Sequence, residues 1–146
     1  MATAASGTMV ASGHFYGFGR FGDDSLDHRH ELPMAGRVGF VLAIEPDGSP
    51  RWARQIGGWP SALTIAPEGR AAVTTGGEFG PSQVTVFDLA GTLRGTWRPS
   101  SGIDANTAAI AIGADQVLVG IDWMGAVAFG APPAATQDIA VVSAPF

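Results

Sequence analysis

The chain has 146 residues, a formal net charge of −5 and no cysteine, which is the size of one ordinary domain. The lack of cysteine excludes a disulfide scaffold, a thiolate zinc site and a cysteine nucleophile. All eight basic residues are Arg and lie scattered along an acidic chain. We therefore expect no nucleic-acid partner, because phosphate binding needs concentrated positive charge.

Apolar residues make up 46 % of the chain, which is enough for a core and excludes intrinsic disorder. The longest apolar runs, 39–44 and 108–113, are far shorter than the roughly 18–20 residues that cross a bilayer, so we expect no membrane insertion. Residues 1–7 have neither a positive n-region nor a long apolar h-region and do not form a signal peptide. If the protein is exported, its export signal lies outside this chain.

From residue 9 onward, short apolar runs rich in Val, Ile, Phe and Trp are separated by clusters of Gly, Pro and Asp, and helical periodicity is absent. This pattern is typical of strands joined by turns. It predicts ten strands, in chain order, at Met9–Tyr16, Arg37–Glu45, Arg51–Ile56, Ala62–Ala66, Arg70–Thr75, Gln83–Leu89, Leu93–Arg98, Thr107–Ile112, Gln116–Ile121 and Asp138–Ser143.

Two of these strands differ in their expected burial. Val38–Ile44 is apolar on both faces, which predicts a strand sandwiched between two layers. Leu93–Arg98 alternates apolar or Gly positions with Arg and Thr, which predicts a half-exposed or edge strand. Turns are expected where Gly supplies a positive φ most easily, at Asp47-Gly48, Glu68-Gly69 and Ala90-Gly91.

An internal repeat links these strands. The stretch 40–58 resembles 84–102, with Gly48 matching Gly91 at an offset of 43 residues and Gly58 matching Gly102 at 44. The strand pair that follows also recurs, because Leu63–Ile65 matches Ile110–Ile112 at an offset of 47 and Val73 matches Val119 at 46. A Phe-Gly step closes each unit, at Phe21-Gly22, Phe79-Gly80 and Phe129-Gly130.

A period in the mid-forties with four strands per unit is typical of β-propeller blades. The sequence therefore predicts an all-β fold built from blades of four antiparallel strands. Ten strands make about two and a half blades and an incomplete ring, in a single partial β-propeller domain over 1-146 with repeat units at approximately 1-47, 48-90 and 91-146. Such an arc leaves two sheet faces uncovered and apolar. Three explanations stay open: a piece of a larger protein, which we favour, a homodimer that closes a five-blade ring, or a different closure.

Two motifs carry a family resemblance. One is the stretch 40–58, with its Pro-Asp-Gly turn and its Trp-Ala-Arg-Gln-Ile-Gly-Gly end, followed by Leu-Thr-Ile-Ala-Pro-Glu-Gly at 63–69. The other is a Val-Thr-Gly-x-Phe-type theme at 10–22 and 119–130. Both resemble the bacterial β-propeller repeat family, which is common in large secreted proteins, and the first is also similar to pyrroloquinoline-quinone-like propeller repeats. The resemblance implies an extracellular or cell-surface location.

The densest polar cluster runs from Asp23 to Glu31 and contains a His-x-His pair at His28 and His30. Imidazole and carboxylate together suit zinc or manganese, but nothing in the sequence fixes their geometry, so we favour a solvated loop. His14 is interpreted as a structural or surface residue. The carboxylates Asp88, Asp104, Asp115 and Asp122 follow the pattern of turn chemistry.

The tryptophans fall into two groups. Trp52 and Trp97 recur at equivalent ends of the repeat and predict packing between blades, with Arg51, Arg54, Arg94 and Arg98 on an exposed face beside them. Trp59 and Trp123 do not repeat and stand next to turn residues. Burial is the favoured interpretation for them, and an exposed anchor for a sugar or a protein is the alternative.

No catalytic, cofactor or metal site emerges from these motifs, so we predict a protein that is not an enzyme. The leading hypothesis is a non-catalytic β-propeller repeat module with a structural or interaction role. Its expected partners are other propeller blades or a second copy of the chain, together with a protein or glycan ligand. The competing hypotheses are a fragment of a quinoprotein-like enzyme and a carbohydrate-binding module that uses Trp59 and Trp123.

Overall fold

The computed structural model describes residues 1–28, 38–76, 83–98, 105–113, 116–124 and 137–145. This described part of the chain is all-β, with thirteen strands in four antiparallel sheets and no helix. It therefore contains no helix long and apolar enough to cross a membrane. The predicted all-β class is confirmed.

The first sheet contains β1 (Ala2–Thr3), β2 (Met9–Phe15), β5 (Val38–Ile44) and β6 (Pro50–Ile56), paired in that order. The second sheet is a meander of β7 (Trp59–Ile65), β8 (Ala71–Gly76), β9 (Gln83–Phe87) and β10 (Leu93–Trp97). The third sheet contains β11 (Ala105–Ile112), β12 (Gln116–Met124) and β13 (Gln137–Pro145). Between β2 and β5 the chain inserts a separate hairpin of β3 (Gly17–Phe21) and β4 (Asp24–His28).

Short turns of one type join strands within the sheets. In the turn between β9 and β10, the N–H of Asp88 donates to the carbonyl of Thr92, and the N–H of Gly91 donates back to the carbonyl of Asp88. The same two hydrogen bonds close 4–8, 45–49 and 66–70. The fourth residue is Gly in all of them, with φ of 86°, 87°, 93° and 78° at Gly7, Gly48, Gly69 and Gly91. The three turns predicted from Gly48, Gly69 and Gly91 are thus confirmed, since only Gly adopts this conformation without steric cost.

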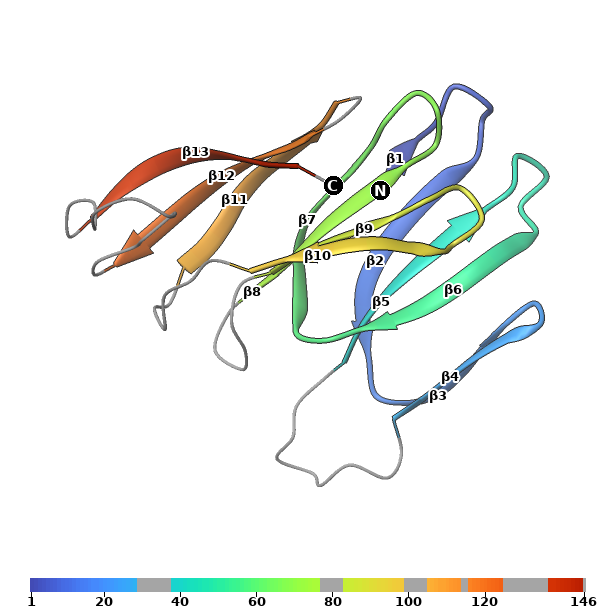
Figure 1. Ribbon diagram of the computed structural model, residues 1–146. Coiled ribbons are helices and arrows are strands. Elements are labelled where there is room, and N and C mark those ends of the chain that lie inside the picture. The colour runs from blue at the N-terminus through green and yellow to red at the C-terminus, as the bar shows by residue number, and fades with distance from the viewer. Residues whose placement is uncertain (29–37, 77–82, 99–104, 114–115, 125–136, 146) are drawn as a thin grey trace.

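The sheets stack face to face in chain order, and Figure 1 shows the stack running from the third sheet on the left, through the second, to the first sheet and the hairpin on the right. Two apolar clusters hold the stack together. Between the first and second sheets lie Val10, Val41, Ala43, Trp52, Ile56, Ala71, Val73 and Phe87. Between the second and third lie Ala72, Val84, Val86, Val117 and Val119, with Trp97, Ile110 and Ile112 packed against them. The second sheet is therefore covered on both faces.

All ten predicted strands have a counterpart among the described residues, with ends that differ by up to three residues. β7, for example, begins at Trp59 rather than Ala62. The structure adds β1 and the hairpin, which the sequence pattern did not indicate. β10 is an edge strand of its sheet, as predicted, and carries a β-bulge between Leu93 and Gly95.

The prediction that the strand Val38–Ile44 is covered on both faces is wrong. In β5 every second residue, including Val41 and Ala43, is buried against the second sheet, while the residues between them stay half-exposed. The strand with both faces buried is β8, where Ala71 to Thr75 are all buried. The reason is the layer order, because β8 lies in the middle sheet whereas the first sheet has only the hairpin on its other side.

Candidate interaction surfaces

The expected loop at Asp23–Glu31 is in part a strand. Residues 24–28 form β4, which pairs with β3 around the two-residue turn Gly22-Asp23, while 29–31 lie outside the described residues. Gly22 has a φ of 60°, the positive value that the first position of a type II′ hairpin turn requires. The prediction of a loop overlooked this Gly-Asp pair, which is a signal that could have indicated the hairpin.

Asp24 ties this hairpin to the outer strand of the first sheet. Its carboxylate accepts hydrogen bonds from the N–H of Ala53 at 2.8 Å and from Nη1 of Arg54 at 2.9 Å. The N–H of Ala53 lowers the pKa of Asp24, and the Arg54 charge adds to this effect. Within the described residues no group of three His, Cys, Asp or Glu side chains comes close enough to hold a metal ion. Asp24 therefore serves as a structural acceptor that covers the edge of β6.

Trp52 packs between two sheets, as the sequence predicts. Its Nε1 donates to the carbonyl of Leu89 at 2.9 Å, its ring tilts against Phe87, and only 3 % of the residue is exposed. Arg54 lies over the indole at 5.9 Å, and its Nε donates to the carbonyl of Gly91 at 3.0 Å. Trp97 is half-buried and packs against the cluster between the second and third sheets. Both indoles thus belong to the core and not to a ligand site.

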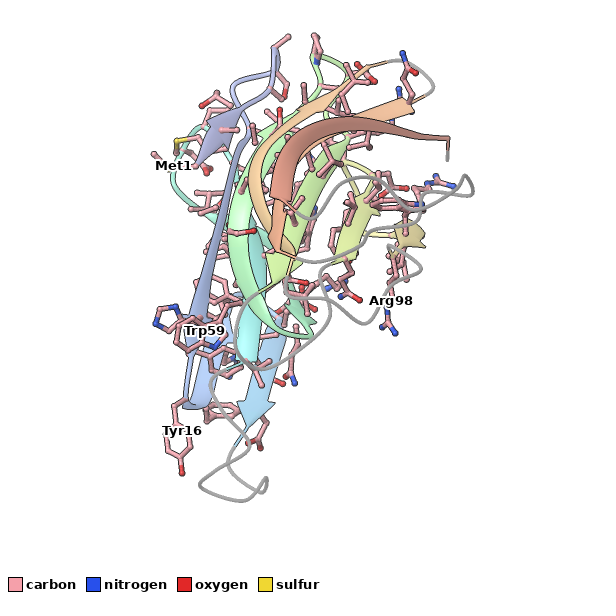
Figure 2. The ribbon with its side chains drawn as sticks, turned by 90° about the vertical axis from the view of Figure 1, so that its left-hand side faces the viewer. Met1, Tyr16, Trp59 and Arg98 are labelled. Carbon is pink, nitrogen blue, oxygen red and sulfur yellow. The ribbon has the colours of Figure 1, made fainter. Side chains whose placement is uncertain are left out.

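Trp59 does not form an open platform. It is half-buried at the start of β7, and its ring stacks on His14 with centroids 5.5 Å apart and an interplanar angle of 13°. Figure 2 shows Trp59 and the exposed Tyr16 along the same side of the molecule, with Arg98 on the opposite side. Trp123 pairs through its backbone with Ala105 and Asp138, and its side chain lies outside the described residues. The predicted anchor of Trp59 and Trp123 therefore lies only in part within the described residues.

The carboxylates at strand ends serve the turns. One oxygen of Asp88 accepts from the N–H groups of Ala90 and Thr92 at 2.9 and 2.8 Å, and the other pairs with Arg94 at 2.7 Å. The Thr92 bond is the main cause that lowers the pKa of Asp88. Asp104 and Asp115 lie outside the described residues, as does the side chain of Asp122.

The faces at the two ends of the stack are the remaining candidate surfaces. The first turn of each sheet is closed by a hydrogen bond to the carbonyl of an equivalent residue, which is Thr8, Arg70 or Gln116. The residues that follow these three can therefore be compared position by position. Val10 and Ala72 are 1 % and 0 % exposed because a following sheet covers them, whereas Leu118 at the same position is 39 % exposed. One residue earlier, Ala71 and Val117 are each 1 % exposed, whereas Met9 is only half-buried.

We name these two surfaces by the direction in which they point. The front face of the first sheet points away from the second sheet and includes Met9, Ala11, Leu42 and Ile44, all half-buried, together with Phe40, on which Phe21 of the hairpin stacks. The back face of the third sheet also points away from the second and includes Ala109, Ala111, Leu118 and the polar Gln116, all exposed. Both faces are mostly apolar, and sequence periodicity alone did not reveal them, because it does not say which sheets stand at the ends.

Comparison with known protein families and with curated proteins found no match to this chain.

Proposed function

We propose that this chain is a non-catalytic module of the β-propeller type with a structural or interaction role, in which the three sheets act as consecutive blades. One observation carries the proposal. Residues at the same position in successive sheets share the same burial wherever a neighbouring sheet exists, and they differ only at the two ends of the stack. Repeat architectures behave in this way, because each unit buries its faces only against its neighbours.

The repeat offsets agree with this interpretation. Leu63 and Ile110, which match at 47 residues, both lie in the first strand of their sheet and pack against a core cluster. Val73 and Val119, which match at 46, both lie in the second strand and are 0 % and 1 % exposed. The Phe-Gly steps at Phe79 and Phe129 lie outside the described residues. The sheets of four, four and three strands amount to almost three blades, against the expected two and a half.

An interaction role is supported by the end faces of the stack, since the back face of the third sheet is exposed while the hairpin packs on part of the front face of the first. Complete propellers usually contain about four to eight blades, so three would leave an open arc whose end faces need further sheets. Exposed apolar residues gathered on one sheet face, such as Ala109, Ala111 and Leu118, favour a protein contact. The family resemblance adds the proposal of a secreted or cell-surface protein.

The charges of the described residues support a non-catalytic role. The four acidic groups with clearly shifted pKa values, Asp24, Asp47, Glu68 and Asp88, are all shifted downward by hydrogen bonds within turns or at a strand edge. A general acid that works near neutral pH needs the opposite shift. These carboxylates instead stay ionised and hold the turns.

The quinoprotein alternative has a direct test. The purified protein is titrated with pyrroloquinoline quinone in the presence of calcium, and visible absorption is recorded after removal of the free quinone. We expect no band to remain with the protein. A retained band at one quinone per chain would overturn the non-catalytic proposal.

The stacking itself is tested by hydrogen exchange. We expect the slowest amide exchange in β8, because both of its faces are covered, and faster exchange in β2 and β12. Equal protection of the three strands would contradict a stack with the second sheet in the middle.

A further inference from the structure

The third sheet ends on a strand whose outer side pairs with no other strand among the described residues. This strand, β13, pairs with β12 through nine consecutive positions, from Gln137 to Pro145, without a register shift. In the first and second sheets the corresponding place is filled by a fourth strand, β6 or β10. The third sheet thus presents a regular row of backbone N–H and C=O groups to which one more strand can bind.

The other edge strands of the three stacked sheets each carry a feature that hinders such pairing. β1 has only two residues. In β6 the N–H of Ala53 is already bonded to the carboxylate of Asp24. A register shift interrupts the pairing of the remaining three edge strands, β7, β10 and β11. Proteins keep an edge from pairing by short strands, covered groups and bulges of this kind, so the long and regular β13 is the edge that is suited to bind another strand.

We propose that two copies of this chain pair through β13 about a two-fold axis at Val141, so that their third sheets join into one sheet of six strands. This inference rests on the interaction role proposed above and names its partner. A two-fold axis perpendicular to the sheet makes the two β13 strands antiparallel, as neighbouring strands are throughout the described sheets. Val141 is the middle of the nine residues, so an axis there lets all of them pair.

The sequence of β13 favours an antiparallel pair with itself. Asp138 is the one charged residue of the strand. Around Val141 each Asp138 lies opposite Ala144 of the other copy, because both are three residues from the centre. A parallel pair would instead place two carboxylates side by side, which is unfavourable. The middle of the strand, from Ile139 to Val142, is apolar and mainly β-branched, which favours strand pairing.

The second sheet leaves room for the added strand. Its most extensive contacts with the third sheet are those of β7 and β8 with β11. β11 and β13 are opposite edges of the third sheet, and Figure 1 shows β13 on the side of β12 that is away from the second sheet. A strand that binds β13 therefore lies beyond the region that the second sheet covers. Because the pair occupies the regular edge of both copies, association stops at two.

The mass of the complete chain in solution tests the proposal. Light scattering coupled to size exclusion should give twice the chain mass of 14.9 kDa. Val141→Lys and Val141→Glu should each give a monomer, because like charges would face each other at the axis. Leu93→Lys is the matched control, because Leu93 is 56 % exposed on the edge strand β10, and it should remain a dimer.

Mixing the two charged variants tests the axis itself. An equal mixture of Val141→Lys and Val141→Glu should regain a dimer, since opposite charges then meet at the centre, and this recovery also shows that both variants fold. A wild-type monomer, an unlimited polymer, a dimer that persists in both single variants or a mixture that stays monomeric would each overturn the proposal.

The position of the contact has a second test, because the chain contains no cysteine. In Val141→Cys the two thiols stand opposite each other, where Cβ atoms of an antiparallel pair lie about 4.5–5.5 Å apart, so a short bismaleimide should join the copies. In Leu118→Cys the thiols lie on the two β12 strands, three strand spacings of about 4.8 Å apart, and should stay unlinked. Linkage of Leu118→Cys without linkage of Val141→Cys would indicate contact through the back face of the third sheet and would overturn the proposal.

Failure of this inference can be told apart from failure of the proposed module. Slow amide exchange in β8 reports the stacked sheets and does not depend on association. A wild-type monomer that keeps this slow exchange contradicts the pairing only, whereas a loss of the protection contradicts the stacked sheets.

Discussion

Gly91 and Gly48 hold the same place in two turns of the same type, but their surroundings differ. Both have a positive φ, of 78° and 87°. A Cβ at Gly48 would meet no atom within 4 Å, whereas a Cβ at Gly91 would stand 2.7 Å from two ring atoms of Trp52. The indole cannot easily withdraw, because it is 3 % exposed and bonded to the carbonyl of Leu89. Alanine at these two positions therefore separates backbone strain from steric conflict.

The expected magnitudes follow from these surroundings. Gly48→Ala places an L-residue in a left-handed conformation, which costs about 1–2 kcal/mol, partly offset by about 0.4–1 kcal/mol from a less flexible unfolded chain. Its net loss should be about 1 kcal/mol. Gly91→Ala adds overpacking against Trp52, which costs about 1–3 kcal/mol more. The free energy of unfolding should thus fall by about 2–4 kcal/mol.

Urea unfolding followed by far-ultraviolet circular dichroism measures both variants. A third variant, Trp52→Leu, should be destabilised alone, but adding Gly91→Ala to it should cost only as much as Gly48→Ala costs in the wild type. Equal losses for Gly48→Ala and Gly91→Ala would refute the assignment of Gly91 to close contact with Trp52. So would a Gly91→Ala penalty that persists in full in the Trp52→Leu background.

Three further predictions concern the core, the hairpin and pH. Val73→Ala, at a 0 % exposed position of the middle sheet, should lower the free energy of unfolding by about 2 kcal/mol, and a loss no larger than that of Leu93→Ala would contradict its burial. Asp24→Ala removes the acceptor of the Ala53 N–H and the partner of Arg54, so hydrogen exchange at Ala53 should quicken while β8 stays protected. Unchanged exchange at Ala53 would contradict the contact between the hairpin and β6. The pKa of Asp24 and of Asp88 is lowered from 3.8 on folding, so each carboxylate stabilises the fold fully above that pH and loses its contribution as the pH falls through the lower folded pKa. Urea midpoints should hold steady from neutral pH to about pH 4 and fall below it, less steeply in Asp24→Asn, and an unchanged slope in that variant would contradict the role of Asp24.

The hairpin contains a strand, β4, that its own residues do not predict. β4 reads Asp-Ser-Leu-Asp-His, with a single apolar residue, Leu26, that is 4 % exposed. Such a segment has low intrinsic strand preference, and its polarity points to a loop. What makes it a strand is pairing with β3 and the bond from Asp24 to β6, which are contacts between residues distant in the sequence.

Local chemistry determined much of this protein from the sequence alone. The alternation of apolar runs with Gly, Pro and Asp located ten strands, the turn residues located three positive-φ glycines, and the recurrence of Trp52 and Trp97 indicated their packing between sheets. These features depend on residues that are neighbours in the chain, or on spacing that repeats, so they can be predicted without coordinates.

The tertiary structure alone decided the order of the layers, and with it the burial of each face. Ala72 and Leu118 occupy the same position in a strand, yet one is 0 % and the other 39 % exposed, because a sheet follows the second sheet and, among the described residues, none follows the third. For the same reason, the strand that is buried on both faces is Ala71–Gly76 and not Val38–Ile44, as the sequence predicted. An apolar side chain shows that a face can be buried, but only the arrangement of the sheets decides what buries it.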